Sequence, residues 1–565
     1  MPKAAKKSHD CRTVAFVSLG CPKNLVDSEK MLGLLAQSGL TPVPCAADDP
    51  TFGGADAVVV NTCGFLEASK DESLGVIKEA IAAKERGEVR KVVVAGCLVQ
   101  RHRAKMLEWA PGIDAMVGVF DRDKIIDAVF GGSAQRAGTR PALDADAPKY
   151  WIAGNALVAA KERGLATAGL TVNGKDAKGI GYFEDDSARL RLTPRHYAYL
   201  RISEGCNQAC AFCTIPSIRG KMRSKPVEAI LREARELLAD GAHELLLIGQ
   251  DTTSFGDDLG IGLSPPPGGR GPGGGRKSPD PRSLGGLPSL LAGLSDTMDE
   301  MGAKGWLRLM YAYPSNFTDP IIDAFGELVR HGRLLPYLDI PLQHASDRVL
   351  ARMRRHVTRA QQARVIRRLR EAVPGMAIRT TFISGFPGET EADHQELLEF
   401  IDDMKFEAVG VFEYSREPGT PAGTMEADAA LAVPPEVKAR RRGEVMEAQQ
   451  RLAFARAAEL ASAHDEARPL KPDGTPRGRV FDVVIDQALR SQGRATAGVG
   501  TGGRLYAGRT YFQAPQIDAV TYVQSREKLA PGEVVRCVVT GHDGYDLVAR
   551  PADEIEKRVG LKVLK

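Results

Sequence analysis

Three thiols lie within nine residues of the chain, in the stretch Gly205-Cys206-Asn207-Gln208-Ala209-Cys210-Ala211-Phe212-Cys213. The stretch follows a strand-like segment at 199–203, so we expect it at the carboxyl end of a barrel strand, where active sites form. This spacing allows the three thiolates to converge on one iron–sulfur cluster. A 4Fe–4S cluster usually takes four cysteines, so three would leave one iron free to bind a ligand. The alternatives are a zinc site that lacks its fourth ligand and plain burial of three thiols.

The region around this stretch alternates strand-like and helical segments. Helical patterns such as 227–239 and 359–372 separate the strands, and Pro226 and Gly241 bound the first of these helices. Six such units predict a partial (βα)6 barrel. The strand-like segments are 199–203, 244–248, 306–311, 337–340, 378–383 and 408–414.

The chain on either side of this barrel predicts two further domains. The amino-terminal third alternates β-branched runs at 13–18, 57–60 and 91–95 with helical segments, which predicts an α/β domain with a doubly wound parallel sheet. Near the carboxyl end, short strands punctuated by glycine favour a small all-β barrel of the oligonucleotide-binding kind. The predicted division is a doubly wound domain at 11–130, an insertion or linker at 131–192 with no assigned function, the (βα)6 barrel at 193–430, a linker helix at 431–466 and the small barrel at 467–551.

One segment inside the barrel region breaks the alternation. Residues 257–286 contain Pro-Pro-Pro and Gly-Gly-Gly runs and cannot bury enough apolar surface to order themselves. We therefore expect a flexible loop there.

A second group of cysteines lies in the amino-terminal third. Cys21, Cys63 and Cys97 each end a predicted parallel strand. In a doubly wound sheet these strand ends share one edge, where ligands bind. The three thiols could therefore meet and hold another cluster, although burial would explain any one of them taken singly. Cys11, Cys45 and Cys537 lack such a setting and are interpreted as structural.

Composition narrows the class of protein without naming a partner. The 565 residues are 43% hydrophobic and 26% charged, with a net charge of +4, which is ordinary for a globular chain of several domains. No apolar run reaches the roughly 18 residues of a membrane span, and we expect a cytoplasmic protein that does not enter the membrane. Nine cysteines in a reducing compartment favour metal ligation or burial over disulfides. Without a heptad pattern, a monomer is the default expectation.

The cysteine stretch resembles the signature of the radical S-adenosylmethionine (radical-SAM) superfamily, which has three cysteines at this spacing and an aromatic residue before the last. Phe212 fills that aromatic position, and the resemblance places its backbone near the adenine. It also places Gln250, in Gly249-Gln250-Asp251, near the methionine amino group. Ile383 and Gly385 resemble the turn on the adenine side. For Gln250 and Ile383, ordinary packing at a strand end is the alternative.

Longer motifs resemble the methylthiotransferases over nearly the whole chain. These are Gly20-Cys21-Pro22-Lys23-Asn24-Leu25-Val26-Asp27-Ser28-Glu29, Asn61-Thr62-Cys63-Gly64-Phe65 and Gly96-Cys97. Within that group, Pro22-Lys23-Asn24 and the segments at 311–314 and 337–346 resemble the RimO branch, whose members modify an aspartate of small-subunit ribosomal protein S twelve.

The resemblance implies a specific reaction. The product would be 3-methylthioaspartate, formed at an unactivated β-carbon, which requires a radical because that carbon has no acidic proton. The Cys206, Cys210, Cys213 cluster would reduce one S-adenosylmethionine to methionine and a 5′-deoxyadenosyl radical. A second S-adenosylmethionine would methylate sulfur held on a Cys21, Cys63, Cys97 cluster. Two 4Fe–4S clusters, a sulfur donor and an electron donor of flavodoxin or ferredoxin type are implied, with the free ribosomal protein or the small ribosomal subunit as partner.

The terminal barrel resembles a TRAM domain, a fold associated with RNA binding. Between residues 477 and 550 it carries roughly ten basic and seven acidic side chains, a weak balance for tracking phosphates and a better fit to a protein substrate. Tyr506, Tyr511 and Phe512 are candidate contact residues, with core packing as the safer interpretation. A methylthiotransferase acting on tRNA adenosine, and a noncatalytic iron–sulfur factor that docks on the ribosome, remain the competing hypotheses.

Overall fold

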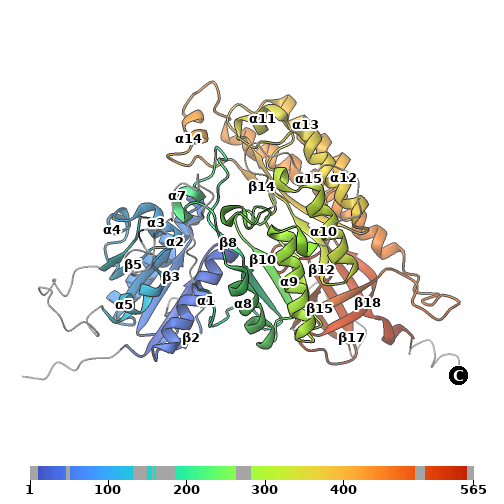
Figure 1. Ribbon diagram of the computed structural model, residues 1–565, viewed down its shortest axis with the longest axis horizontal. Coiled ribbons are helices and arrows are strands. Elements are labelled where there is room, and N and C mark those ends of the chain that lie inside the picture. Colours follow the sequence, from blue (N-terminus) through green and yellow to red (C-terminus); the bar gives the residue numbers. More distant parts are fainter. Residues whose placement is uncertain are drawn as a thin grey trace, which may run out of the picture.

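The computed structural model describes residues 11–45, 51–131, 149–154, 158, 185–262, 281–489 and 503–556. Three large sheets of the described residues follow one another along the chain (Figure 1). An open parallel sheet comes first, a second open parallel sheet forms the centre, and a closed barrel ends the chain. None of the described helices is long and apolar enough to cross a membrane.

The amino-terminal sheet is parallel throughout and has the order β2-β1-β3-β4-β5-β6. Its central strands are buried on both faces, because α1 and α5 cover one face and α2, α3 and α4 cover the other. The doubly wound sheet is therefore confirmed. The strands are β1 (Thr13–Ser18), β2 (Thr41–Val43), β3 (Ala57–Thr62), β4 (Lys91–Gly96), β5 (Ala115–Val117) and β6 (Lys149–Trp151), and the helices are α1 (Pro22–Gln37), α2 (Glu67–Glu85), α3 (Cys97–His102), α4 (Lys105–Trp109) and α5 (Ile125–Phe130).

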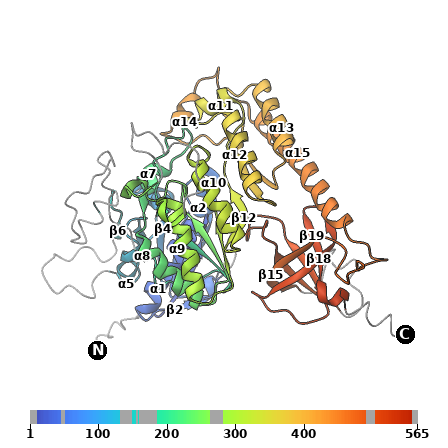
Figure 2. The same ribbon diagram turned by 45° about the vertical axis from the view of Figure 1, so that its right-hand side comes forward.

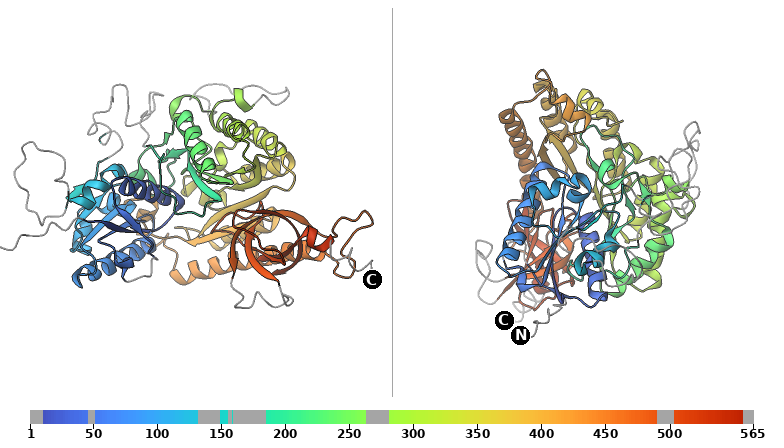
Figure 3. Two further views of the ribbon diagram at one scale, coloured as in Figure 1. Left: turned by 90° about the horizontal axis from the view of Figure 1, so that it is seen from below. Right: turned by 90° about the vertical axis from the view of Figure 1, so that its left-hand side faces the viewer.

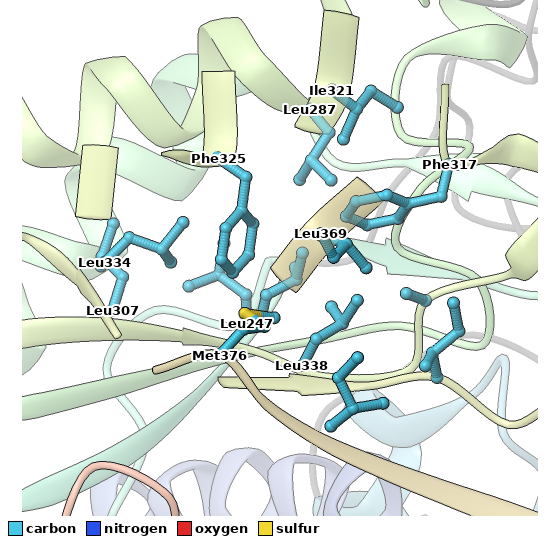
Figure 4. Packing of buried hydrophobic residues seen from close by; sticks show 14 of the residues in the cluster. Leu247, Leu287, Leu307, Phe317, Ile321, Phe325, Leu334, Leu338, Leu369 and Met376 are labelled. Atoms are coloured by element: carbon cyan, nitrogen blue, oxygen red, sulfur yellow. The ribbon is translucent and has the colours of Figure 1, made fainter. Parts of the chain in front are cut away.

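The central sheet has six parallel strands in the order β14-β13-β12-β11-β10-β7, and its two edge strands do not pair. It is thus the partial barrel that the alternation predicts. Leucine, phenylalanine and methionine side chains from its strands and outer helices form the largest core (Figure 4). The strands are β7 (Tyr197–Arg201), β10 (Glu244–Ile248), β11 (Trp306–Leu309), β12 (Leu334–Asp339), β13 (Ala377–Ser384) and β14 (Ala408–Glu413), and the helices are α8 (Val227–Ala239), α9 (Gly286–Glu300), α10 (Asp319–Arg330), α11 (Asp347–Arg352), α12 (Arg359–Ala372) and α13 (Glu391–Met404).

The predicted strand at 199–203 is divided in the structure. β7 ends at Arg201, and β8 (Ser203–Glu204) pairs antiparallel with β9 (Arg223–Ser224). The division occurs at Ile202, whose two backbone groups bond to different segments. Its N–H donates to the carbonyl of Ile248 at the end of β10, whereas its carbonyl accepts from the N–H of Lys225, just after β9. The resulting small hairpin frames the stretch that contains the three closely spaced cysteines.

The carboxyl-terminal part begins with α15 (Pro435–Ser462), which has a proline in its first turn as expected. The helix leads to a closed five-stranded barrel of order β15-β16-β17-β19-β18, which confirms the small all-β barrel (Figure 2; Figure 3, left). Its strands are β15 (Val480–Leu489), β16 (Arg504–Arg509), β17 (Thr521–Ser525), β18 (Val534–Asp543) and β19 (Asp546–Pro551).

Two segments without an assigned role are described only in part. Residues 132–148, most of 155–184 and 263–280 lie outside the described residues, and with them most of the predicted flexible loop. At the start of that loop, the Asp258 carboxylate accepts hydrogen bonds from the Ser224 amide at 2.9 Å and the Ser224 hydroxyl at 2.5 Å. The 131–192 segment contributes more to the core than its weak pattern suggests, since it supplies β6 and the fully buried Asp186.

Candidate active site between two cysteine loops

The loop with Cys206, Cys210 and Cys213 is held in shape by its own backbone. Cys206 donates its N–H to Gly220 at 3.1 Å, and Cys213 donates to Cys210 at 3.2 Å. A side chain at Gly205 would place its Cβ 2.3 Å from the Lys221 carbonyl oxygen, and φ there is +76°, so only glycine fits. The stretch with the three thiols therefore forms a defined loop that follows β7 and β8, at the carboxyl end of a barrel strand.

Each of the three sulfurs faces a hydrogen-bond donor. The amides of Gln208 and Ile215 donate to the Sγ atoms of Cys206 and Cys213, both at 3.4 Å. Arg355 donates from Nη1 to the Cys210 sulfur at 3.6 Å. Donors of this kind suit thiolates, and hydrogen bonds to sulfur help set the potential of an iron–sulfur cluster.

Burial raises the pKa of Cys206 and Cys213 to about 12. In the absence of a metal these thiols would hold their protons at neutral pH, which makes them unsuited to act as free nucleophiles. Ligation replaces the proton by iron, so the donor set fits a metal cluster.

The residues expected to bind S-adenosylmethionine form two groups, one on each side of this loop. Phe212 and Ile383 pack in one apolar cluster, and the Phe212 ring lies 6.5 Å from the ring of Phe386. Gly385 has φ of +72°, and an added Cβ would lie 2.2 Å from Lys438 Cγ. The structure thus brings Phe212, Ile383 and the Gly385 turn together.

Gln250 lies on another side of the loop. Its amide nitrogen donates to Glu204 at 2.8 Å, while its buried Oε1 has no partner among the described residues. The neighbouring Asp251 accepts from the Gln208 side chain at 2.9 Å. The 249–251 segment therefore lies against the cysteine loop, with one polar atom free to bind a ligand.

The second set of cysteines also meets at one edge. Cys21 precedes α1 and is exposed, Cys63 follows β3, and Cys97 begins α3. A Cβ added to Gly20 would lie 2.7 Å from Cys63 Cβ, and one added to Gly64 would lie 3.0 Å from the Cys97 carbonyl carbon. The three loops are in contact, as the shared sheet edge predicts.

Arg219 connects the two sets of cysteines. It ends α7 (Ile215–Arg219), the helix that begins two residues after Cys213. Its guanidinium lies 3.0 Å from Asp27 in α1 and 3.0 Å from Glu204 beside the cysteine loop. Burial would lower the pKa of Arg219, but the surrounding negative groups, with Cys97, Glu204 and Asp27 foremost, raise it well above its usual value. Arg219 is therefore a buried cation that pairs with one carboxylate next to the Cys206–Cys213 loop and with another on the helix that follows Cys21.

Sequence reasoning missed this buried charge network. Asp27 also pairs with Arg201 at 2.7 Å, and Arg201 pairs with Asp186 at 2.5 Å. The sequence carries no local signal for this network, and the burial of the consecutive polar residues Asp27, Ser28 and Glu29 of α1 is seen only in the structure. An amphipathic helix would expose part of such a run.

Within the described residues, no three His, Cys, Asp or Glu side chains gather as they would around a single metal ion. In a 4Fe–4S cluster each thiolate binds a different iron, so its ligands stand farther apart than those of one ion. The cluster assignment of both cysteine sets therefore remains a prediction.

The remaining cysteines and aromatic candidates have packing roles. Cys537 lies in the core of the terminal barrel, while Cys11 and Cys45 pack against the amino-terminal cores. Tyr506 is buried in the barrel core. Tyr511 donates its hydroxyl to the Gly375 carbonyl at 2.8 Å, and Phe512 packs beside it with rings 5.2 Å apart. These contacts agree with the packing interpretation of the aromatic residues.

Three family models match the chain in order. The model described as "Uncharacterized protein family UPF0004" matches residues 13–118, the Radical SAM superfamily matches 200–264 and 281–401, and the TRAM domain matches 478–551. Among solved structures, a radical S-adenosylmethionine methyltransferase from Kitasatospora setae is similar, with a TM-score of 0.48, 16% identity, and coverage of 73% of this chain and 75% of that one.

Relatives named "Ribosomal protein uS12 methylthiotransferase RimO" match almost end to end. The protein from Symbiobacterium thermophilum is 36% identical over 96% of this chain and 91% of its own length. The one from Marinobacter nauticus is 37% identical over 95% of each chain. Radical-SAM enzymes use a 4Fe–4S cluster and S-adenosylmethionine as cofactors. The chain therefore belongs to the RimO family of methylthiotransferases and is a radical-SAM enzyme.

Proposed function

We propose that this protein attaches a methylthio group to the β-carbon of an aspartate in ribosomal protein uS12, giving 3-methylthioaspartate. The reaction would consume two molecules of S-adenosylmethionine and a sulfur donor. The observation that carries the proposal is that Arg219, buried beside the Cys206–Cys213 loop, pairs with Glu204 next to that loop and with Asp27 of the helix that follows Cys21, in a chain of the RimO family.

The two sets of cysteines and the residues around them fit the cofactors of this reaction. Cys206, Cys210 and Cys213 would hold the cluster that binds S-adenosylmethionine, and Cys21, Cys63 and Cys97 would hold the second. When bound, these groups would supply the electron, the carbon radical, the sulfur and the methyl group. Phe212, Gln250, Ile383 and Gly385 would bind S-adenosylmethionine around the first cluster.

The protein's own contribution is orientation and the exclusion of water. Tyr311 and Tyr313 follow β11, where Tyr311 is half-buried and Tyr313 is buried. The Tyr313 hydroxyl lies 3.9 Å from Cys210 Sγ, and the Arg355 guanidinium stacks 3.9 Å from the centre of the Tyr313 ring. Such a lining keeps water from a reactive carbon radical and holds the reacting groups in fixed positions.

Several accompanying assignments belong to this proposal. We propose an electron donor of flavodoxin or ferredoxin type, a monomeric enzyme and a cytoplasmic location. The domain bounds proposed above (11–130, 131–192, 193–430, 431–466 and 467–551) are retained. The substrate is either free uS12 or uS12 within the assembled small ribosomal subunit.

Anaerobic reconstitution tests the proposed reaction. The protein is loaded with iron and sulfide, then mixed with dithionite, S-adenosylmethionine and uS12. A gain of roughly 46 Da on one aspartate, with 5′-deoxyadenosine formed, would support both the chemistry and the target. The Cys210→Ala variant should form neither product, whereas Cys11→Ser should behave as wild type.

Two outcomes would redirect the assignment. If 5′-deoxyadenosine forms and uS12 keeps its mass, tRNA becomes the substrate to test. If Cys210→Ala retains its biological effect on ribosomes, the noncatalytic docking hypothesis replaces the enzyme.

A further inference from the structure

Lys23 is a buried cation that no carboxylate neutralises. It lies in the first turn of α1, two residues after Cys21, and its relative exposure is 8%. Its ammonium nitrogen stands 3.2 Å from the centre of the Tyr311 ring. Among the described residues, no hydrogen bond or ion pair is found for this ammonium, although a buried charge is costly unless it is paired.

The acidic groups nearest to Lys23 are already paired with arginines. Glu204 binds Arg201 at 2.6 Å and Arg219 at 3.0 Å. Asp339, at the end of β12, binds Arg379 at 2.9 Å. Lys23 thus has no carboxylate partner among the described residues, and an anion from outside the chain would pair with it.

The backbone at Tyr311 is strained in a way that fixes this arrangement. Tyr311 has φ of +60°, which a non-glycine residue adopts only at an energetic cost. Its carbonyl accepts a hydrogen bond from the Thr252 amide at 3.1 Å, and this bond helps to hold the strained conformation. Strain of this kind is concentrated at ligand-binding positions, and here it presents the ring to Lys23.

The position of Lys23 suits the substrate's reacting carbon. Two residues beyond Tyr311, Tyr313 reaches Cys210 of the proposed S-adenosylmethionine cluster. Lys23 itself is two residues from Cys21 of the other cysteine set. An anion held at Lys23 would therefore lie near both loops, where the radical and the sulfur would be delivered.

We propose that Lys23 binds the side-chain carboxylate of the substrate aspartate and so determines which residue of the protein substrate is modified. The inference rests on the proposed function, which requires a carboxylate one bond from the reacting β-carbon. An ammonium–carboxylate pair in a buried site is a strong charge-assisted contact, and it rejects an amide in the same place.

Binding to uS12 without turnover tests this role. The reconstituted enzyme, with S-adenosylmethionine and no reductant, is titrated with uS12 and with a set of uS12 variants in which each aspartate in turn becomes asparagine. The wild-type enzyme should bind one of these variants about tenfold or more weakly than uS12, which corresponds to roughly 1.4 kcal/mol. Lys23→Met should bind uS12 and that variant equally, and Lys23→Arg should keep most of the discrimination.

Lys30→Met is the matched control. Lys30 lies on the same helix and donates to the Ser187 carbonyl at 2.7 Å, away from Tyr311, so its variant should discriminate like wild type. Lys23→Met should also retain its iron content.

Three results would overturn the inference. These are a wild-type enzyme that binds every uS12 variant equally, a Lys23→Met enzyme that still discriminates, and a Lys23→Met enzyme that loses iron, which would assign Lys23 to the charge balance of the cluster. Failure of the proposed function would give a different result. In that case the difference in affinity between uS12 and its variant would still depend on Lys23, but uS12 would gain no mass when reductant is added.

Discussion

Replacing Glu244 by glutamine should weaken the attachment of the terminal barrel to the central barrel. Glu244 begins β10, is fully buried, and binds Arg308 at 2.5 Å and Arg509 of the terminal barrel at 2.7 Å. Burial alone would raise its pKa, but the charges and hydrogen bonds of Arg308 and Arg509 outweigh burial and hold the pKa at about 2, below its usual 4.5. This difference of about 2.5 pKa units corresponds to roughly 3 kcal/mol.

The sign of this effect fixes its pH dependence. A carboxyl whose pKa is lowered by folding stabilises the folded state above its unfolded pKa, near 4.5, and loses that contribution as the pH falls toward 2. Glu244→Gln should therefore be about 3 kcal/mol less stable than wild type at pH 7, and the difference should shrink below pH 4.

Urea unfolding of the apoprotein, followed at several pH values, measures the difference. Asp240→Asn is the control, because the Asp240 side chain is 51% exposed and solvent screens its pairs with Arg191 and Arg195, so the expected effect is below about 1 kcal/mol. The reasoning would be refuted if the two variants lost the same free energy of unfolding, or if the loss in Glu244→Gln did not change with pH.

Three further changes test the site and its supports. Asp186→Asn should cost about 3 kcal/mol in urea unfolding, because it removes one buried negative charge shared by Arg201 and Lys225, which keep their other carboxylates; a loss below about 1 kcal/mol would contradict the network. Gly385→Ala should weaken S-adenosylmethionine binding at least tenfold in calorimetry, whereas Gly443→Ala in α15, which has nothing within 4 Å of an added Cβ, should not. Arg219→Met should lower the iron content after reconstitution by up to one cluster per chain. An unchanged iron content would contradict a role of Arg219 in stabilising a cluster at Cys97.

Sequence patterns predicted the three architectures and both groups of cysteines because these features have local signals. Strands that end in cysteine are visible in the order of residues, and parallel topology then brings their ends together. The charge network has no such signal, since Asp186 pairs with Arg201 and Arg122 only after three segments have packed. Residue periodicity reports which face of an element is buried, but it does not report which distant charge will neutralise another.

Because periodicity does not reveal contacts between distant residues, the sequence motif that contains Lys23 indicates no role for this residue. Its contact with Tyr311 joins residues from two domains, and the strained backbone that presents the ring is visible only in coordinates.

A helix of five residues, α7, connects the surroundings of the two cysteine sets. α7 starts two residues after Cys213 and ends at Arg219, and its Ile218 packs with Cys97 and Phe120 of the amino-terminal domain. A displacement of the Cys206–Cys213 loop would therefore move both the counter-ion and the apolar contact of the amino-terminal set. Because buried charges interact strongly across short distances, a change in charge at one set should alter the electrostatics of the other through Arg219. The 131–192 segment supports the same arrangement at two points, where Ala153 packs in the cluster with Cys97 and Ile218 and where Asp186 pairs with Arg201.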